Sequence, residues 1–158
     1  MPDDILFRRR YRIPSARLPG WDYRWAGVYH VTICTQGRMQ CLGDVVDGKV
    51  SLSPIGKVVA EKWLKIPTYH PQIALDEWIV MPDHMHGILI FQGPMQENES
   101  LDIVIGRFKA ACTKRIWRHF NRRDFDWQER FYDNILRDLA DLERVRAYIR
   151  NNPANWKP

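Results

Sequence analysis

The sequence is poor in cysteine: Cys34, Cys41 and Cys112 are its only three, and they show no Cys-x-x-Cys spacing. An odd number without that spacing argues against a disulfide framework and against a zinc ribbon, and it fits a reducing compartment. The sequence also lacks an apolar signal core at its N-terminus and any apolar run of the roughly 18 residues that a membrane span requires. We therefore expect a cytoplasmic protein with no membrane partner.

Positive charge is in moderate excess, with 24 Lys and Arg against 19 Asp and Glu and a formal net charge of +5. Such an excess favours a polyanionic partner. The charge gathers in an N-terminal arm and in a later segment that also carries aromatic residues. The basic residues that we single out are Arg8, Arg9, Arg10, Arg107, Lys109, Lys114, Arg115 and Arg118. Taken alone, either cluster fits a solvated surface as well as a nucleic-acid interface.

Hydrophobic periodicity predicts one domain over residues 27–158, preceded by a basic, aromatic arm over residues 1–26. Strands are expected at residues 28–35, 39–46, 50–52, 73–80 and 84–91, the first three forming a meander with a turn at Asp47-Gly48. Helices are expected after the caps Ser53, Ser100 and Asp138, and residues 124–134 give no clear pattern. This order predicts an α+β fold, a ferredoxin-like or RRM-like sandwich with a mostly antiparallel sheet and helices on one face.

Two histidines separated by one residue, His84 and His86, interrupt an otherwise apolar strand. Alternate residues of a strand point to the same face, so the two imidazoles lie side by side. A shared metal ion explains the pair better than two structural histidines bonded to backbone or water, a reading that suits a lone histidine. The ion needs at least one more ligand. Asn152 can supply an amide oxygen from the last helix, where Tyr148 lies one turn earlier on the same face.

A tyrosine beside a bound cation has a specific chemical use. Its oxygen can attack a phosphodiester that the metal polarises, which would link the strand to the protein as a phosphotyrosine. This exchange conserves the phosphodiester bond and needs no nucleotide hydrolysis, in agreement with the absence of a Gly-x-x-x-x-Gly-Lys-Ser/Thr loop. Spacing alone nevertheless favours a Tyr148 that only covers the edge of the core.

Five ordered segments resemble the single-tyrosine HUH transposases, most closely the IS200-like and REP-associated tyrosine transposase proteins. They are residues 27–36, residues 75–88 with the histidine pair, Phe108-Lys109, residues 127–137, and residues 148–156. Five motifs in order are far more specific than a lone His-x-His. The resemblance implies that His84 and His86 bind Mg or Mn, that Tyr148 is the nucleophile, and that Asn152 is a third ligand.

The resemblance further implies a nucleoid-associated transposase, or a domesticated relative, that nicks and rejoins single-stranded DNA beside a hairpin. Two alternatives stay open. One is a metal-dependent phosphodiesterase in which water attacks and Tyr148 is structural. The other is a single-stranded DNA- or RNA-binding module without catalysis, in which the basic clusters carry the whole function. The last helix could dock within one subunit or across a homodimer.

Overall fold

The computed structural model describes residues 22–23, 25–93, 95–96 and 99–158, so Arg8, Arg9 and Arg10 of the arm lie outside the described residues. Its elements, in chain order, are β1 (Gly27–Cys34), η1 (Gln36–Arg38), β2 (Gly43–Val46), β3 (Lys49–Leu52), α2 (Pro54–Leu64), α3 (Ile66–Tyr69), β4 (Ile73–Val80), β5 (His84–Phe91), α4 (Leu101–Phe120), β6 (Tyr132–Ile135), α5 (Leu139–Asn151) and η3 (Pro153–Asn155). None of the helices in this part of the chain has the length and hydropathy to cross a bilayer.

The main sheet has four antiparallel strands in the order β4-β5-β1-β6. The α+β class and the mostly antiparallel sheet are therefore confirmed. In the β1-β5 pairing, Thr32 lies opposite His86 and Cys34 lies opposite His84. Strand β6 comes from the segment without a clear pattern. It is a four-residue edge strand with alternating exposure, too short for a periodic signal.

The expected meander is wrong, because β2 and β3 form a separate two-stranded sheet. Residues after β1 turn through η1, so β2 begins at Gly43 rather than at Met39. The predicted turn is confirmed: Asp47 and Gly48 both adopt positive φ, 52° and 72°, as the tight hairpin turn requires.

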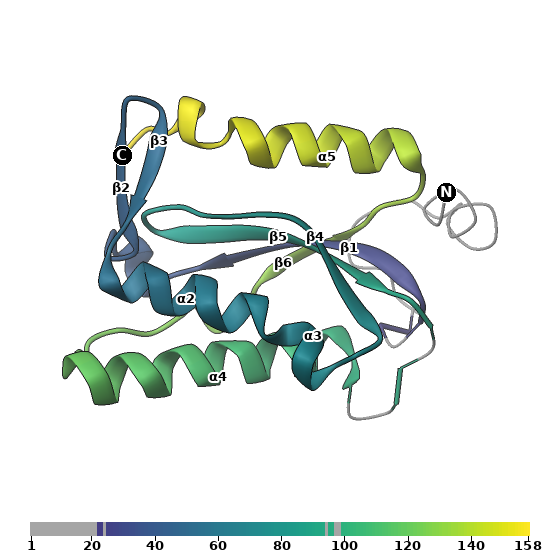
Figure 1. The fold of residues 1–158 in the computed structure, drawn as a ribbon, viewed down its shortest axis with the longest axis horizontal. Helices are drawn as coiled ribbons and strands as arrows, with labels where there is room; N and C mark the ends of the chain where they lie inside the picture. The colour runs from purple at the N-terminus through teal and green to yellow at the C-terminus, as the bar shows by residue number, and fades with distance from the viewer. Residues whose placement is uncertain (1–21, 24, 94, 97–98) are drawn as a thin grey trace.

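Helices cover both faces of the main sheet, with α2 and α4 on one face and α5 on the other (Figure 1). Alternation along β5 fixes this arrangement. Gly87 faces Trp63 of α2, where a Cβ at Gly87 would lie 2.2 Å from the indole, whereas the neighbouring His86 faces Tyr148 of α5. The expectation of helices on one face thus holds for α2 and α4, and α5 departs from it because its apolar residues cover the histidine face.

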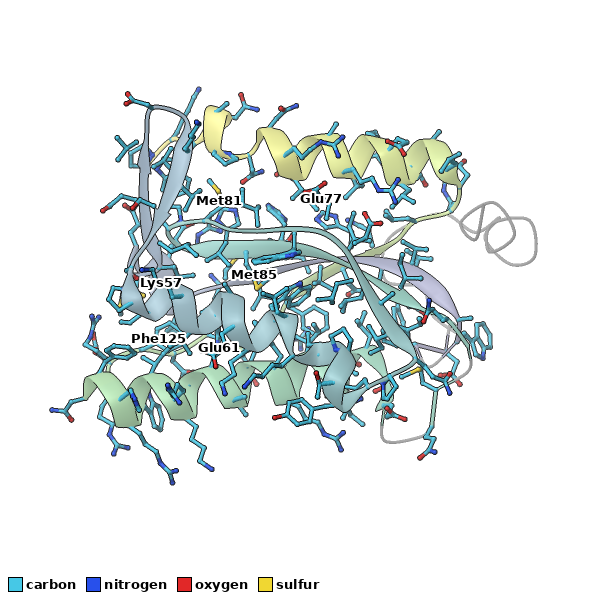
Figure 2. All side chains as sticks on the ribbon, viewed as in Figure 1. Lys57, Glu61, Glu77, Met81, Met85 and Phe125 are labelled. Atoms are coloured by element: carbon cyan, nitrogen blue, oxygen red, sulfur yellow. The ribbon has the colours of Figure 1, made fainter. Side chains whose placement is uncertain are left out.

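The principal core lies between the sheet and the α2-α4 layer, and side chains fill the space on both sides of the sheet (Figure 2). Met85 points into this core, where Trp63 packs edge-on against Phe108 with ring centroids 5.3 Å apart. Helix α5 buries a smaller set, Leu142, Val145 and Ile149. Two ion pairs also join α5 to β4: Arg146 to Asp76 at 2.6 Å and Arg150 to Glu77 at 3.1 Å.

Candidate active site

Strand β5 places His84 and His86 on the face that α5 covers, with ring centroids 4.9 Å apart. The prediction that the two imidazoles share one face is confirmed. Both residues are buried, at 7% and 5% exposure. Buried imidazoles need hydrogen-bond partners, so the contacts of each ring decide which nitrogen remains available.

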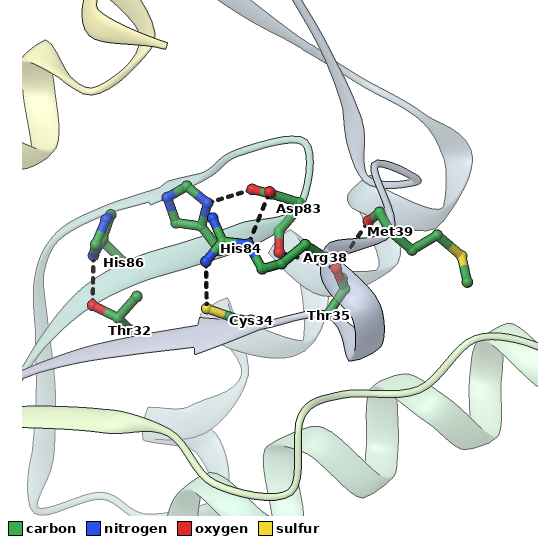
Figure 3. Close-up of polar contacts among 8 residues, drawn as sticks. All are labelled: Thr32, Cys34, Thr35, Arg38, Met39, Asp83, His84 and His86. Atoms are coloured by element: carbon green, nitrogen blue, oxygen red, sulfur yellow. Dashed lines mark hydrogen bonds and ion pairs between the residues drawn. The ribbon is translucent and has the colours of Figure 1, made fainter. Parts of the chain in front are cut away.

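The Nδ1 atom of each imidazole already has a partner (Figure 3). His84 Nδ1 lies 2.6 Å from Asp83 Oδ1, and the other oxygen of that carboxylate accepts a hydrogen bond from Arg38 Nε at 2.9 Å. His86 Nδ1 lies 2.8 Å from Thr32 Oγ1 and 3.2 Å from His30 Nε2. Both Nε2 atoms are therefore the ones left for a ligand.

The two available Nε2 atoms, from His84 and His86, fit a divalent cation that has only two imidazoles of the protein among its ligands. Among the described residues, no group of three or more His, Cys, Asp or Glu side chains is placed to hold a metal. His30 is near, but its Nε2 faces His86 Nδ1 instead of converging with the free nitrogens. The remaining positions would be filled by an amide oxygen, water or a substrate phosphate, which are ligands that Mg and Mn accept.

Burial keeps two of these histidines uncharged. Desolvation lowers the pKa of His30 to about 4, with the nearby positive charge of Arg144 acting in the same direction. Desolvation also lowers the pKa of His86 to about 3, and His84 and His30 add to the effect. A neutral imidazole keeps the lone pair that coordinates a metal, so His86 is ready to bind one at neutral pH.

Helix α5 brings Tyr148 to the histidine pair of its own chain. The Tyr148 ring centroid lies 5.2 Å from that of His86 and 6.4 Å from that of His30. Tyr148 is nevertheless 53% exposed, so a substrate could approach it from solvent. Asn152 is the C-cap of α5, partly buried and one turn beyond Tyr148, as its spacing predicts.

Four residues near the pair were missed from the sequence: His30 and Thr32 on β1, Asp83 before β5, and Arg38 in η1. His30 and Thr32 alternate on β1 as the histidines do on β5. That alternation is a usable signal only once the pairing of β1 with β5 is known. Downstream of α5, the Trp156 ring also lies against His84, with centroids 6.2 Å apart.

Some basic residues of α4, together with the loop that follows it, line a groove on the other face of the sheet. This α4 groove has a volume of about 880 Å³ and includes Lys114, Arg118 and Arg123 around Trp117. Arg123 lies over the Trp117 ring at 5.5 Å. Lys109 also lines the groove, but its Nζ donates to the carbonyl oxygens of residues 128 and 129, which anchors the following loop. Arg107 and Arg115 are exposed on α4 but do not line it.

Comparison with known proteins supports one family. The family model described as Transposase IS200 like matches residues 23–152. An uncharacterized protein of Haemophilus influenzae is 32% identical in an alignment of 162 positions that covers 90% of this chain and 89% of that protein. A second protein of that organism, named as a REP-associated tyrosine transposase, is 32% identical over 83 residues, 47% of this chain and 46% of its own length.

Two solved structures share the fold. One is described as a REP-associated tyrosine transposase bound to a REP hairpin, with a TM-score of 0.63, 19% identity, and coverage of 88% of this chain and 73% of that one. The other, described as a transposase from Deinococcus radiodurans R1, has a TM-score of 0.54 and 18% identity, and the match covers 85% of this chain and 95% of its own. With the family match extending over most of its length, the chain belongs to the IS200-like transposase family.

Proposed function

We propose that this protein, through a single domain over residues 27–158, nicks and rejoins single-stranded DNA by a covalent phosphotyrosine intermediate on Tyr148. One observation carries the proposal: Tyr148 is exposed to solvent while its ring lies 5.2 Å from that of His86. A nucleophile needs both an accessible oxygen and a place beside the metal ligands, and Tyr148 combines the two. The same chain supplies Tyr148 and both histidines, which supports a site built within one subunit.

In this proposal His84, His86 and Asn152 would hold Mg or Mn. When bound, the ion would act as a Lewis acid on the scissile phosphate. Tyr148 Oη loses its proton and forms the new bond to phosphorus, the bond from phosphorus to the oxygen of one strand end breaks, and that oxygen takes up a proton and leaves as a hydroxyl. A second strand hydroxyl reverses the exchange and frees the tyrosine, so no high-energy nucleotide is consumed.

The substrate that we propose is single-stranded DNA containing a hairpin. The solved relative is described as bound to a REP hairpin, which supports this partner. The α4 groove, with Lys114 and Arg118, would hold phosphates at a distance from the point of cleavage, and the arm with Arg8, Arg9 and Arg10 would add to the hold. A protein with this substrate belongs in the cytoplasm, with the nucleoid.

The groove and the histidine face adjoin at the C-terminal end of β1. The backbone N–H of Gln128, a residue of the groove, donates to Cys34 O at 2.8 Å, and Cys34 pairs with His84. In η1, Gln36 lines the groove and Arg38 binds the carboxylate beside His84. A strand that leaves the groove can therefore reach Tyr148 by passing around this end of the sheet.

The deciding experiment is Tyr148→Phe, because phenylalanine keeps the ring and removes only the oxygen. The wild type, incubated with Mn²⁺ and labelled single-stranded hairpin DNAs, should give a covalent adduct on a denaturing gel, and Tyr148→Phe should give none. Tyr132→Phe and Tyr69→Phe are matched controls, since these tyrosines are also exposed, at 67% and 71%, and should keep the adduct. An adduct in Tyr148→Phe would refute the assignment of the nucleophile.

The same assay separates the two alternatives. If the wild type cuts DNA without ever forming an adduct, and Tyr148→Phe still cuts, water is the nucleophile and the protein is a phosphodiesterase. His84→Ala and His86→Ala should each lose cleavage and lose the metal-binding signal in calorimetry. Cleavage that persists in excess chelator would overturn the metal-dependent mechanism. DNA binding without any cleavage in Mn²⁺ would identify a non-catalytic binding module.

A further inference from the structure

Asp83 precedes β5, at the bend of residues 82–83, and its carboxylate turns to the same face as the His84 ring. Successive residues inside a strand would point to opposite faces. The bend removes that constraint, so Asp83 Oδ1 can lie 2.6 Å from the Nδ1 atom of its own neighbour. The motif thus contains a carboxylate as well as two imidazoles.

The position of Asp83 is fixed from two sides. Its carbonyl oxygen accepts hydrogen bonds from the backbone N–H and from Oγ1 of Thr35, both at 3.0 Å. Its second carboxylate oxygen is bound to Arg38 Nε at 2.9 Å (Figure 3). Asp83 is 5% exposed, so water competes little for these contacts. The carboxylate therefore presents one oxygen to His84 in a defined place.

We propose that Asp83 is a positioning residue that holds His84 in the tautomer and orientation needed to bind the catalytic ion, and this rests on the proposed function. An ionised carboxylate only accepts hydrogen bonds, so His84 Nδ1 must carry the proton and Nε2 keeps its lone pair. The carboxylate also makes the ring a stronger ligand. The partner of His86 is different in kind, because the Thr32 hydroxyl can either donate or accept.

The same contacts would also be made if Asp83 only clamped η1 to the bend. The test must therefore measure the tautomer of the His84 ring and not only the stability of the protein. Long-range proton-nitrogen NMR of the metal-free protein reports which ring nitrogen carries the proton. In the wild type, His84 should be protonated at Nδ1 alone. In Asp83→Ala, both tautomers of His84 should appear. A mixed tautomer in the wild type would overturn the proposal.

Calorimetric titration with Mn²⁺ gives the second readout. Asp83→Asn and Asp83→Ala should bind Mn²⁺ about 10- to 100-fold more weakly than the wild type, the usual range for an outer partner of a ligating histidine. Glu99→Gln is the matched control, because Glu99 Oε2 lies 2.8 Å from Nδ1 of the buried His70, outside the candidate site. It should leave the Mn²⁺ affinity unchanged.

Wild-type Mn²⁺ affinity in both Asp83 variants, with His84 still protonated at Nδ1, would show that Asp83 is only a clamp. If the wild type binds no Mn²⁺ at all, both the metal-dependent function and the role of Asp83 in positioning a metal ligand would be contradicted. A wild type that binds Mn²⁺ but forms no DNA adduct would contradict the proposed function alone. The affinity and tautomer comparisons would then still decide the role of Asp83.

Discussion

Gly87 offers the sharpest test of how β5, the strand that carries His84 and His86, packs against α2. It follows His86 directly, on the opposite face of β5, and a Cβ at this position would lie 2.2 Å and 2.7 Å from two atoms of the Trp63 indole. Trp63 is fully buried and packs against Phe108, so the ring has no free space into which to move. Overpacking of this kind costs about 1–3 kcal/mol. We expect Gly87→Ala to lower the free energy of unfolding by about that amount.

Urea unfolding followed by circular dichroism measures the effect, and Gly106→Ala provides the control. A Cβ at Gly106 meets nothing within 4 Å on an exposed position of α4, so this variant should gain about 0.5–1 kcal/mol from helix propensity. The smaller ring of Trp63→Phe should relieve part of the Gly87→Ala loss in the double variant. A Gly87→Ala protein within about 0.5 kcal/mol of the wild type would refute the packing argument.

Three further predictions follow from the site and the groove. Burial lowers the pKa of His30 to about 4 and that of His86 to about 3. As the pH falls, these histidines therefore bind protons in the unfolded chain before they do so in the folded protein. The metal-free protein should thus lose stability as the pH falls from 6.5 toward 4. Urea titrations across that window check this, and a flat profile would contradict it. Lys114→Ala and Arg118→Ala should each weaken single-stranded DNA binding and reduce the slope of log affinity against log salt by about 0.7, whereas unchanged slopes would mean that the groove is only solvated surface. Asn152→Ala should weaken Mn²⁺ binding in calorimetry without abolishing it, and wild-type affinity would exclude Asn152 as a ligand.

Local rules explain why much of the fold could be predicted. Ser53 and Asp138 cap α2 and α5 through their side chains, accepting hydrogen bonds from the N–H groups of Gly56 and Asp141. The shared face of His84 and His86 needs nothing beyond the period of a strand. These features depend on residues close in sequence, and for that reason the sequence shows them.

Features that depend on pairing between distant segments could not be predicted. His30 and Thr32 reach His86 only through the register of β1 with β5, which no local pattern specifies. Strand β6 needs β1 beside it to form at all. Arg107 and Lys114 belong to the same basic segment of the sequence, but the groove depends also on the loop that packs against α4, and Arg107 does not line it.

The sheet separates the α4 groove from the histidine face, and this has an evolutionary consequence. Under the proposed function, one substitution at Tyr148 would end strand transfer and leave every basic side chain of the groove in place. Such a descendant would still occupy its DNA sites without cutting them, as a repressor or a competitor of active copies does. If the proposed function holds, a single substitution would therefore convert a strand transferase into a DNA-binding regulator.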